Sequence, residues 1–405
     1  MQMADPRVPE STSRHLQLPT GQLQVQLASG DFAFDDLLGF AARANNKRGF
    51  LFLSKVLGKH WPSNPTQMLG VQEYLAQQIA DDLPGPILFI AMAETAIGLG
   101  QGVFEAWRRQ HPEQTALFLH SSRYRLPACD VFEFAESHSH APRQFLHLPP
   151  DASARQIFEQ ARSLVLIDDE ASTGNTFVNL CAAYRQRNQA LEQIHIGVIA
   201  NFIAQEQRDQ LALGLPYRLS AAICAQYQFT SAALSPQLNE RIASQPAQRF
   251  DAELDSGARA DFGRLGRSQC LAAPLQLADK LARQIGMQDT VLVLGTGEFM
   301  HPPFLLALAM QRLGMQVVLQ SSTRSPILQW GDVACALSFA DNYNEGILNY
   351  LYNVKPGQYR HILICHETPV QSSLLDLARQ LQGAQGQVRL LHFLSEQEIE
   401  EISVC

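Results

Sequence analysis

Short runs of apolar residues, each followed by small or polar residues and then by a helix-like segment, recur along the chain. In the first half they cover residues 87–91, 116–120, 164–167 and 194–200. Apolar runs of this length, bounded by turn residues, are typical of strands buried on both faces, as in a parallel sheet with helical connections. The pattern therefore predicts an α/β fold in which a parallel sheet is flanked by helices.

The N-terminal region is less regular. We expect residues 1–30 to form a poorly ordered lead-in with a short strand at 23–27, and the apolar residues of 32–44 are spaced as in a helix. Residues 50–57 form another apolar run, which is followed by Lys59. This lysine could reach a phosphate, but charges beside an apolar run usually face solvent, and we favour that interpretation.

The second half of the chain repeats the first in outline. Four of its segments match segments of the first half in the same order: 291–298 with 87–94, 316–326 with 116–125, 337–344 with 133–139, and 361–368 with 164–172. Four paired elements in one order favour an internal duplication. Near residue 235 the chain becomes rich in Ser, Pro and Gln without periodicity. We therefore predict a first domain at 1–235 and a second, related Rossmann-like α/β domain at 236–405.

The most informative stretch begins with Asp168 and Asp169, directly after an apolar run, and continues into a loop that must open a helix. The residues there that offer hydroxyl or backbone N–H donors are Ser172, Thr173, Gly174, Asn175 and Thr176. The first N–H groups of a helix lack intrahelical partners, so they can converge on an anion together with the helix dipole. The two carboxylates would repel that anion unless a sugar diol lies between them and donates O–H bonds. The stretch therefore predicts a site for a sugar phosphate.

Residues 164–176 resemble the phosphoribosyl-pyrophosphate (PRPP) signature of type I, orotate phosphoribosyltransferase-like phosphoribosyltransferases. The shared features are four apolar positions, two acids and a Thr-Gly-x-Thr close. Asn175 stands where glycine is frequent, and asparagine tolerates a positive φ. The resemblance implies the type I phosphoribosyltransferase fold with a hood over the reaction centre. It also implies that Asp168 and Asp169 hold the ribose, and that Mg²⁺ binds through PRPP rather than directly to the protein.

A competing interpretation is the Walker B strand of a P-loop ATPase, since apolar residues followed by acids also suit a Mg²⁺ site. That interpretation requires a Gly-x-x-x-x-Gly-Lys-Ser/Thr loop. The nearest candidate, residues 53–60, lacks the first glycine and the final hydroxyl. A plain buried strand with a solvated turn would leave the adjacent acids and the donor-rich loop unexplained. We therefore favour the phosphoribosyltransferase interpretation.

Three further segments are site candidates on the same resemblance. The loop after the first core strand would hold the pyrophosphate through Ala91, Met92, Ala93, Glu94 and Thr95. Small residues there let the backbone approach the ligand. Glu94 departs from the basic or neutral residue expected, and could hold Mg²⁺ through water or cap the next helix. Ser122 and Arg123 end the next strand and could contact a phosphate. His138 and His140 lie where the family has its mobile hood and could donate to the departing pyrophosphate.

Thr323, Arg324 and Ser325 resemble the signature of the TRSP domain. This domain follows phosphoribosyltransferase-like domains in proteins linked to bacterial tellurium-resistance and stress operons. Together with residues 47–52 and the central motif, the resemblance covers most of the chain. A loop in the same half could line a pocket with Gly295, Thr296, Gly297 and Glu298. This half lacks the acid pair and the Thr-Gly-x-Thr loop, so it should not bind PRPP in the same way. Whether it binds a base or docks a partner stays open.

Composition narrows the choice of partners. The net charge is −8 and no run of Lys or Arg is present, which argues against nucleic acid or an acidic membrane surface as a partner. Seven scattered cysteines without a C-x-x-C pair are typical of reduced thiols in a cytoplasmic protein, and no stretch approaches the length of a membrane span. A homodimer and association with other enzymes of the same operon are left open.

We therefore expect a Mg²⁺-dependent enzyme that transfers the 5-phosphoribosyl group of PRPP to a nitrogenous base or similar acceptor. Pyrophosphate would be released, and the product would serve in synthesis of a nucleotide-like compound. The alternative is a PRPP-sensing regulatory protein without catalysis. His138 and His140 favour the enzyme, because such regulators can lose the catalytic hood.

Overall fold

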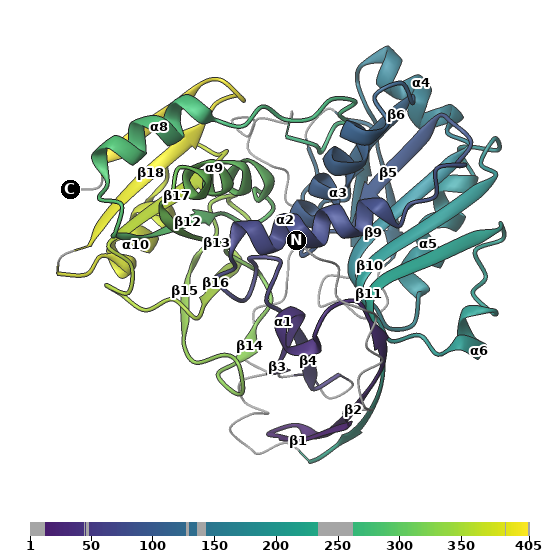
Figure 1. Ribbon diagram of the computed structural model, residues 1–405, viewed down its shortest axis with the longest axis horizontal. Coiled ribbons are helices and arrows are strands. Elements are labelled where there is room, and N and C mark those ends of the chain that lie inside the picture. Colours follow the sequence, from purple (N-terminus) through teal and green to yellow (C-terminus); the bar gives the residue numbers. More distant parts are fainter. Residues whose placement is uncertain are drawn as a thin grey trace.

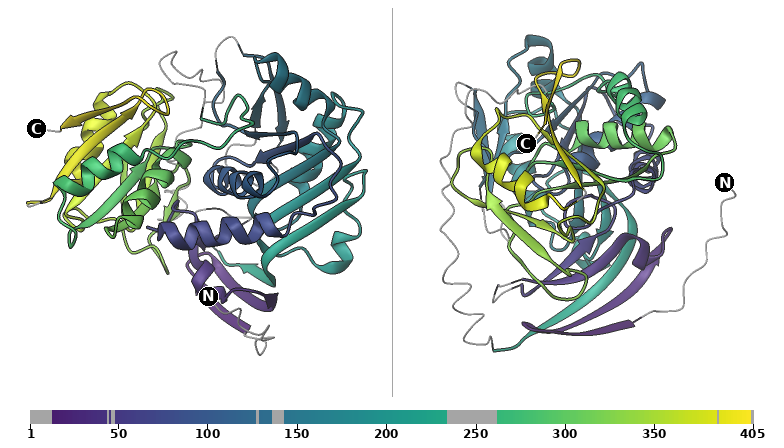
Figure 2. Two further views of the ribbon diagram at one scale, coloured as in Figure 1. Left: turned by 45° about the horizontal axis from the view of Figure 1, so that its top comes forward. Right: turned by 90° about the vertical axis from the view of Figure 1, so that its left-hand side faces the viewer.

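The structure is a computed structural model and describes residues 13–43, 45, 48–126, 129–135, 143–233, 262–384 and 386–403. These residues form two α/β lobes with helix α2 (Pro65–Gln77) between them, and a smaller group of strands lies beside both (Figure 1). Figure 2 shows the same two lobes from other sides. No helix in these ranges is long and apolar enough to cross a membrane.

A seven-stranded sheet forms the core of the first lobe. Its order is β1-β2-β11-β10-β9-β5-β6; the five strands from β11 to β6 are parallel, and β2 and β1 are added antiparallel at one edge. The strands are β1 (Ser13–Leu18), β2 (Gly21–Gly30), β5 (Ile87–Ala91), β6 (Ala116–His120), β9 (Ser163–Ala171), β10 (Gln193–Asn201) and β11 (Tyr217–Ser231). This sheet confirms the predicted α/β class.

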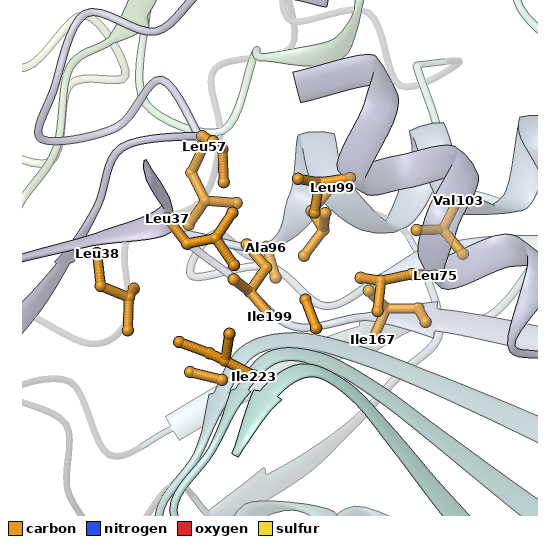
Figure 3. Packing of buried hydrophobic residues seen from close by; sticks show 14 of the residues in the cluster. Leu37, Leu38, Leu57, Leu75, Ala96, Leu99, Val103, Ile167, Ile199 and Ile223 are labelled. Carbon is orange, nitrogen blue, oxygen red and sulfur yellow. The ribbon is translucent and has the colours of Figure 1, made fainter. Parts of the chain in front are cut away.

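Helices cover both faces of this sheet, and they are α2, α3 (Ile97–Gln110), α4 (Ala152–Gln160) and α5 (Asn175–Arg185), with a short α6 (Gln205–Arg208) beyond β10. Ile167 of β9 packs in one core cluster with Leu75 of α2 and Leu99 of α3, as Figure 3 shows. The neighbouring Leu166 points to the opposite face, into a cluster that contains residues of α4 and α5. Burial on both faces is why these strands are continuous apolar runs in the sequence.

A five-stranded sheet forms the second lobe, in the order β13-β12-β17-β18-β19. Its first four strands are parallel and β19 is antiparallel to β18. The strands are β12 (Thr290–Gly295), β13 (Gln316–Ser321), β17 (His361–His366), β18 (Gln387–Phe393) and β19 (Ile399–Ser403), and the helices are α8 (Leu275–Gln284), α9 (His301–Arg312) and α10 (Ser372–Leu381).

The two sheets share one strand order. The series β6-β5-β9-β10-β11 of the first corresponds to β13-β12-β17-β18-β19 of the second, and an antiparallel pair of strands precedes the third core strand in each lobe. These pairs are β7 (Val131–Ala135) with β8 (Arg143–His147), and β15 (Ala336–Ala340) with β16 (Leu348–Tyr352). The internal duplication proposed from the sequence would account for this correspondence.

A three-stranded antiparallel sheet joins the two halves of the chain. Its order is β14-β3-β4: β3 (Leu38–Arg43) and β4 (Phe50–Ser54) precede the first core strand, and β14 (Ile327–Leu328) comes from the second half. The prediction of a helix over residues 32–44 is wrong beyond the single turn α1 (Phe34–Leu37). Both faces of β3 are buried, so its apolar residues fit a strand as well as a helix.

One further boundary differs from expectation, and another lies outside the described residues. The prediction of a lead-in with one short strand is wrong for residues 13–30, which form the antiparallel pair β1 and β2. The predicted domain boundary at residue 235 lies outside the described residues. Beyond it, Arg267 forms an antiparallel bridge with Phe118 of β6, so a segment assigned to the second domain packs on the first lobe.

Candidate functional site

A pocket of about 160 Å³ lies where the carboxyl ends of β5 and β9 meet β3, β4 and the second half of the chain. Five segments far apart in the sequence contribute to it. Its lining consists of Arg43, Arg48, Leu51, His60, Ala93, Glu94, Thr95, Arg123, Asp168, Asp169, Glu170, Ala171, Ser172, Thr173, Gly174, Thr176, Phe177, Thr323, Arg324 and Ser325. Polar ligands bind at this edge of open parallel sheets because the strand ends and following helix N-termini point toward it.

The adjacent acids lie in the last part of β9, which extends four residues beyond the apolar run. Asp168 accepts a hydrogen bond from the N–H of Asp169 at 2.9 Å, and the Thr95 hydroxyl donates to Asp169 at 3.1 Å. Burial raises the pKa of Asp169, and the neighbouring Glu170 raises it further. A ligand hydroxyl or cation that approaches this carboxylate would therefore favour its ionised form.

The loop behind the acids leads into α5 through Gly174, whose φ of 75° is in the left-handed region. A Cβ at this position would lie 2.6 Å from Leu211 Cδ2. Asn175 is the first residue of α5; it is exposed and does not line the pocket. The positive φ that was considered for Asn175 is found at Gly174 instead. The N-terminus of α5, with Ser172, Thr173 and Thr176 around it, is open to the pocket as an anion site would require.

The loop between β5 and α3 contributes Ala93, Glu94 and Thr95 to the pocket. Ala91 and Met92 are buried in the core clusters of the lobe and do not line it. Of the two roles left open for Glu94, a cap of α3 finds no support, since the N-cap of that helix is Ala96 without a side-chain hydrogen bond.

Glu94 pairs instead with Lys59, whose Nζ lies 2.7 Å from its Oε1. Lys59 is 1% exposed, so the expectation that it faces solvent is wrong. Burial raises the pKa of Glu94, but the charges of Lys59, Arg324 and Arg123 outweigh that effect and hold its pKa below the usual value. The acid in this loop is therefore ionised and balanced by cations of both halves.

The side chains of Ser122 and Arg123 lie in different surroundings. The Ser122 hydroxyl is buried and donates to Glu298 of the second half at 2.7 Å, and the Arg123 N–H donates to the same carboxylate at 2.6 Å. The Arg123 side chain reaches the pocket, where it donates to the carbonyl of Ala93 at 3.3 Å. Only Arg123 of the two is therefore placed to meet a ligand in this pocket.

Of the candidate residues from the second half, one group lines the pocket and the other does not. Thr323, Arg324 and Ser325 line the pocket, because β14 directly after them pairs with β3. The loop of Gly295, Thr296, Gly297 and Glu298 does not line it and is buried behind it. The second half therefore reaches the site with its TRSP segment.

Seven residues of the pocket lining were not among the sequence candidates: Arg43, Arg48, Leu51, His60, Glu170, Ala171 and Phe177. Arg48 forms an ion pair with Glu170 across the pocket wall. Burial, together with the charges of Arg43 and Lys59, lowers the pKa of His60 to about 3, so this ring is neutral. Arg48 lies between the apolar segments 32–44 and 50–57. A charged residue between two such segments carries no signal of its partner in the tertiary structure. His138 and His140 lie outside the described residues.

The pocket lining carries four arginines (Arg43, Arg48, Arg123 and Arg324) and four carboxylates (Glu94, Asp168, Asp169 and Glu170). Within the ranges that the structure describes, no group of three or more His, Cys, Asp and Glu side chains could hold a metal ion. A magnesium ion that takes its ligands from water and from the oxygens of a bound phosphate compound does not require such a group. The arrangement can thus hold an anionic sugar phosphate with hydroxyl groups on one side.

Two protein families match the chain. The family described as phosphoribosyl transferase matches residues 37–227, and the TRSP domain found C-terminal to that transferase matches residues 256–381. No curated protein matches the chain.

Several solved structures are similar to part of the chain. Adenine phosphoribosyl transferase from Trypanosoma brucei, in complex with AMP, pyrophosphate and ribose-5-phosphate, is 12% identical, with 47% of this chain and 77% of that chain covered and a TM-score of 0.34. The enzyme from Giardia lamblia complexed with 9-deazaadenine is 16% identical, with 47% and 95% covered and a TM-score of 0.33. The enzyme from Rhodothermus marinus is 12% identical, with 46% and 94% covered and a TM-score of 0.30.

Proposed function

Since the chain belongs to the phosphoribosyl transferase family, with a TRSP domain C-terminal to the transferase, we propose that it transfers the 5-phosphoribosyl group of PRPP to a nitrogenous base or similar acceptor. The bond between the anomeric carbon and a pyrophosphate oxygen breaks, and a bond from that carbon to the acceptor nitrogen forms. Pyrophosphate leaves, and the product is a nucleotide-like compound.

The observation that carries this proposal is the convergence of three parts on one pocket. The acids Asp168 and Asp169 lie between the loop that opens α5 and the loop that contains Glu94. The α5 N-terminus suits the 5-phosphate, because its N–H groups and dipole favour an anion. The acids suit the ribose hydroxyls, which donate to carboxylates. The remaining loop, with Arg123 beside it, suits the pyrophosphate.

As pyrophosphate departs, positive charge develops on the ribose, and carboxylates already in place stabilise it. Asp168 and Asp169 take this role. A magnesium ion bound through oxygens of PRPP would neutralise charge on the leaving group.

Calorimetric titration of PRPP with Mg²⁺ into the full chain tests the proposal. We expect binding by the wild type, and loss of binding in the double variant Asp168→Asn/Asp169→Asn. The matched control is Asp81→Asn/Asp82→Asn, an adjacent acid pair that lies on the surface with side chains 91% and 72% exposed. The control should bind as the wild type does.

Absence of PRPP binding by the wild type would mean that the pocket holds another phosphate compound, and the transferase proposal would fail. If PRPP binds, nitrogenous bases can be screened for pyrophosphate release. Binding without release from any base would favour the PRPP-sensing regulator.

A further inference from the structure

The two halves of the chain carry the same local arrangement around their second core strand. In the first half the N–H of Ala93 donates to Ser121 Oγ at 2.8 Å, and in the second half the N–H of Gly297 donates to Ser322 Oγ at 2.9 Å. The two serine N–H groups in turn donate to the carbonyls of Ala91 and Gly295 at 2.9 and 3.1 Å. Arg123 and Arg324 each follow two residues after these serines and are structural counterparts.

The two arrangements meet each other in the interior. Ser122 and Arg123 of the first half bind Glu298 of the second half. In the opposite direction, the charge of Arg324 acts on Glu94, the first-half counterpart of Glu298, and helps to lower its pKa. Arg123 and Arg324 therefore both line the one pocket, although they come from different halves.

The counterpart of this pocket in the second half is filled by protein. Arg264 is 2% exposed and donates to Glu298 at 3.2 Å and to Glu367, at the end of β17, at 2.7 Å. The Tyr343 hydroxyl donates to the same Glu367 at 3.0 Å. A guanidinium group thus occupies most of the place where a ligand would enter, and the cavity left against Arg264, Glu298 and Glu367 is about 10 Å³, too small for a sugar phosphate.

Arg324 is held in place before any ligand binds. Its Nη1 lies 2.5 Å from Glu345 Oε2, and its guanidinium stacks over the Tyr124 ring, 5.3 Å from the centroid. Asp341 fixes the turn that carries Glu345, because it accepts the N–H groups of Tyr343 and Glu345 at 2.7 and 3.0 Å. Arg324 is 6% exposed, so its charge acts in a largely dry environment.

We propose that Arg324 binds the pyrophosphate group of the substrate, so that the second half serves as a built-in partner that completes the anion site of the first. This inference rests on the proposed function. The pyrophosphate is the group concerned because Arg324 lines the pocket together with its counterpart Arg123, which donates to Ala93 of the loop that contains Glu94 at 3.3 Å. A guanidinium fork binds two phosphate oxygens at once, which a lysine cannot reproduce. Glu345 is a positioning residue for this fork.

The test measures dissociation constants of PRPP, pyrophosphate and ribose 5-phosphate with Mg²⁺ for the full chain and its variants. Arg324→Ala should weaken the binding of pyrophosphate and of PRPP by about 10- to 100-fold, the scale for losing a hydrogen bond to a charged group. The dissociation constant of ribose 5-phosphate should not change. The pyrophosphate affinity of Arg324→Lys should lie between that of the wild type and that of Arg324→Ala. The control Arg283→Ala removes an arginine from the exposed end of α8 and should change none of the three constants.

Glu345→Gln guards against a variant of Arg324 that fails to fold. This variant should bind pyrophosphate more weakly and ribose 5-phosphate as the wild type does. If Glu345 only stabilised the fold, the binding of both ligands would be weaker. Equal pyrophosphate affinity in wild type and Arg324→Ala, or a selective loss of ribose 5-phosphate, would overturn the role of Arg324 alone. A wild type that binds pyrophosphate but not PRPP would overturn the proposed function. Failure to bind either would overturn both.

Discussion

The Lys59 ammonium group lies 2.7 Å from the Glu94 carboxylate and donates to the carbonyl of Gly297 at 2.6 Å. One buried cation thus joins the N-terminal segment, the loop after β5 and the second half of the chain. Because Glu94 lines the pocket, this contact connects the packing of the two halves with the electrostatics of the site.

Replacing Lys59 by methionine should destabilise the protein by about 3 kcal/mol, because the buried Glu94 carboxylate would lose the cation 2.7 Å away, while Arg123 and Arg324 offset part of the loss. Thermal unfolding should show a lower midpoint, and Lys59→Met/Glu94→Gln should recover part of the loss. The control Lys280→Met breaks the pair with Glu401. The two charged atoms of that pair lie 2.6 Å apart, close to the 2.7 Å of Lys59 and Glu94, but Lys280 is 51% exposed, so the change should cost at most about 1 kcal/mol. Equal shifts in the two lysine variants would contradict a buried pair.

Once an acceptor base is known, Asp168→Asn/Asp169→Asn should lower kcat/KM by at least ~100-fold, the scale for losing preorganised charge around a reacting centre. The readout is pyrophosphate release with that base. The surface pair Asp81→Asn/Asp82→Asn should retain full activity. Activity of the Asp168/Asp169 variant within a few-fold of wild type would remove these acids from the site.

Gly174→Ala should destabilise the protein by about 1–2 kcal/mol and weaken PRPP, because alanine at a φ of 75° is strained and displaces the N–H groups at the start of α5. Gly70→Ala is the matched control. This glycine is exposed within α2, and a Cβ there meets no atom within 4 Å. Alanine at residue 70 should stabilise the helix by about 0.5–1 kcal/mol without changing PRPP affinity. Unfolding midpoints and calorimetry together separate the two outcomes.

Acidification should destabilise the fold partly through His147. Burial and the charges of Arg264 and Arg125 lower its pKa to about 3, so the unfolded chain takes up a proton below pH 6.5 that the folded chain does not. Stability is therefore lost as the pH falls from about 6.5 toward 3, and this histidine accounts for roughly 2 kcal/mol at pH 5.

In His147→Gln the amide oxygen can still accept the Leu126 N–H, which now donates to Nε2 at 3.0 Å. Unfolding at pH 7 and pH 5 should therefore show a smaller acid loss in this variant than in wild type. An equal loss in the two proteins would show that His147 is not held neutral.

Elements that depend on a pattern of neighbouring residues could be predicted from the sequence. The core strands were found because strands buried on both faces are short continuous apolar runs, and the donor-rich loop after Asp168 does open helix α5. The helix expected over residues 32–44 is instead largely strand β3. Its pairing partners are β4 and the distant β14, and a local spacing of apolar residues does not report either.

The sequence by itself determined the α/β class, the acid pair and the donor-rich loop that opens α5, because each depends on residues close together along the chain. Only the tertiary structure decided that Lys59 is buried and that Arg324 lines the pocket. Lys59 and its acceptor Gly297 are 238 positions apart, and no local pattern encodes such a contact. The same charged residue is solvated or buried according to what the rest of the fold brings against it, and that is set when the two halves pack together.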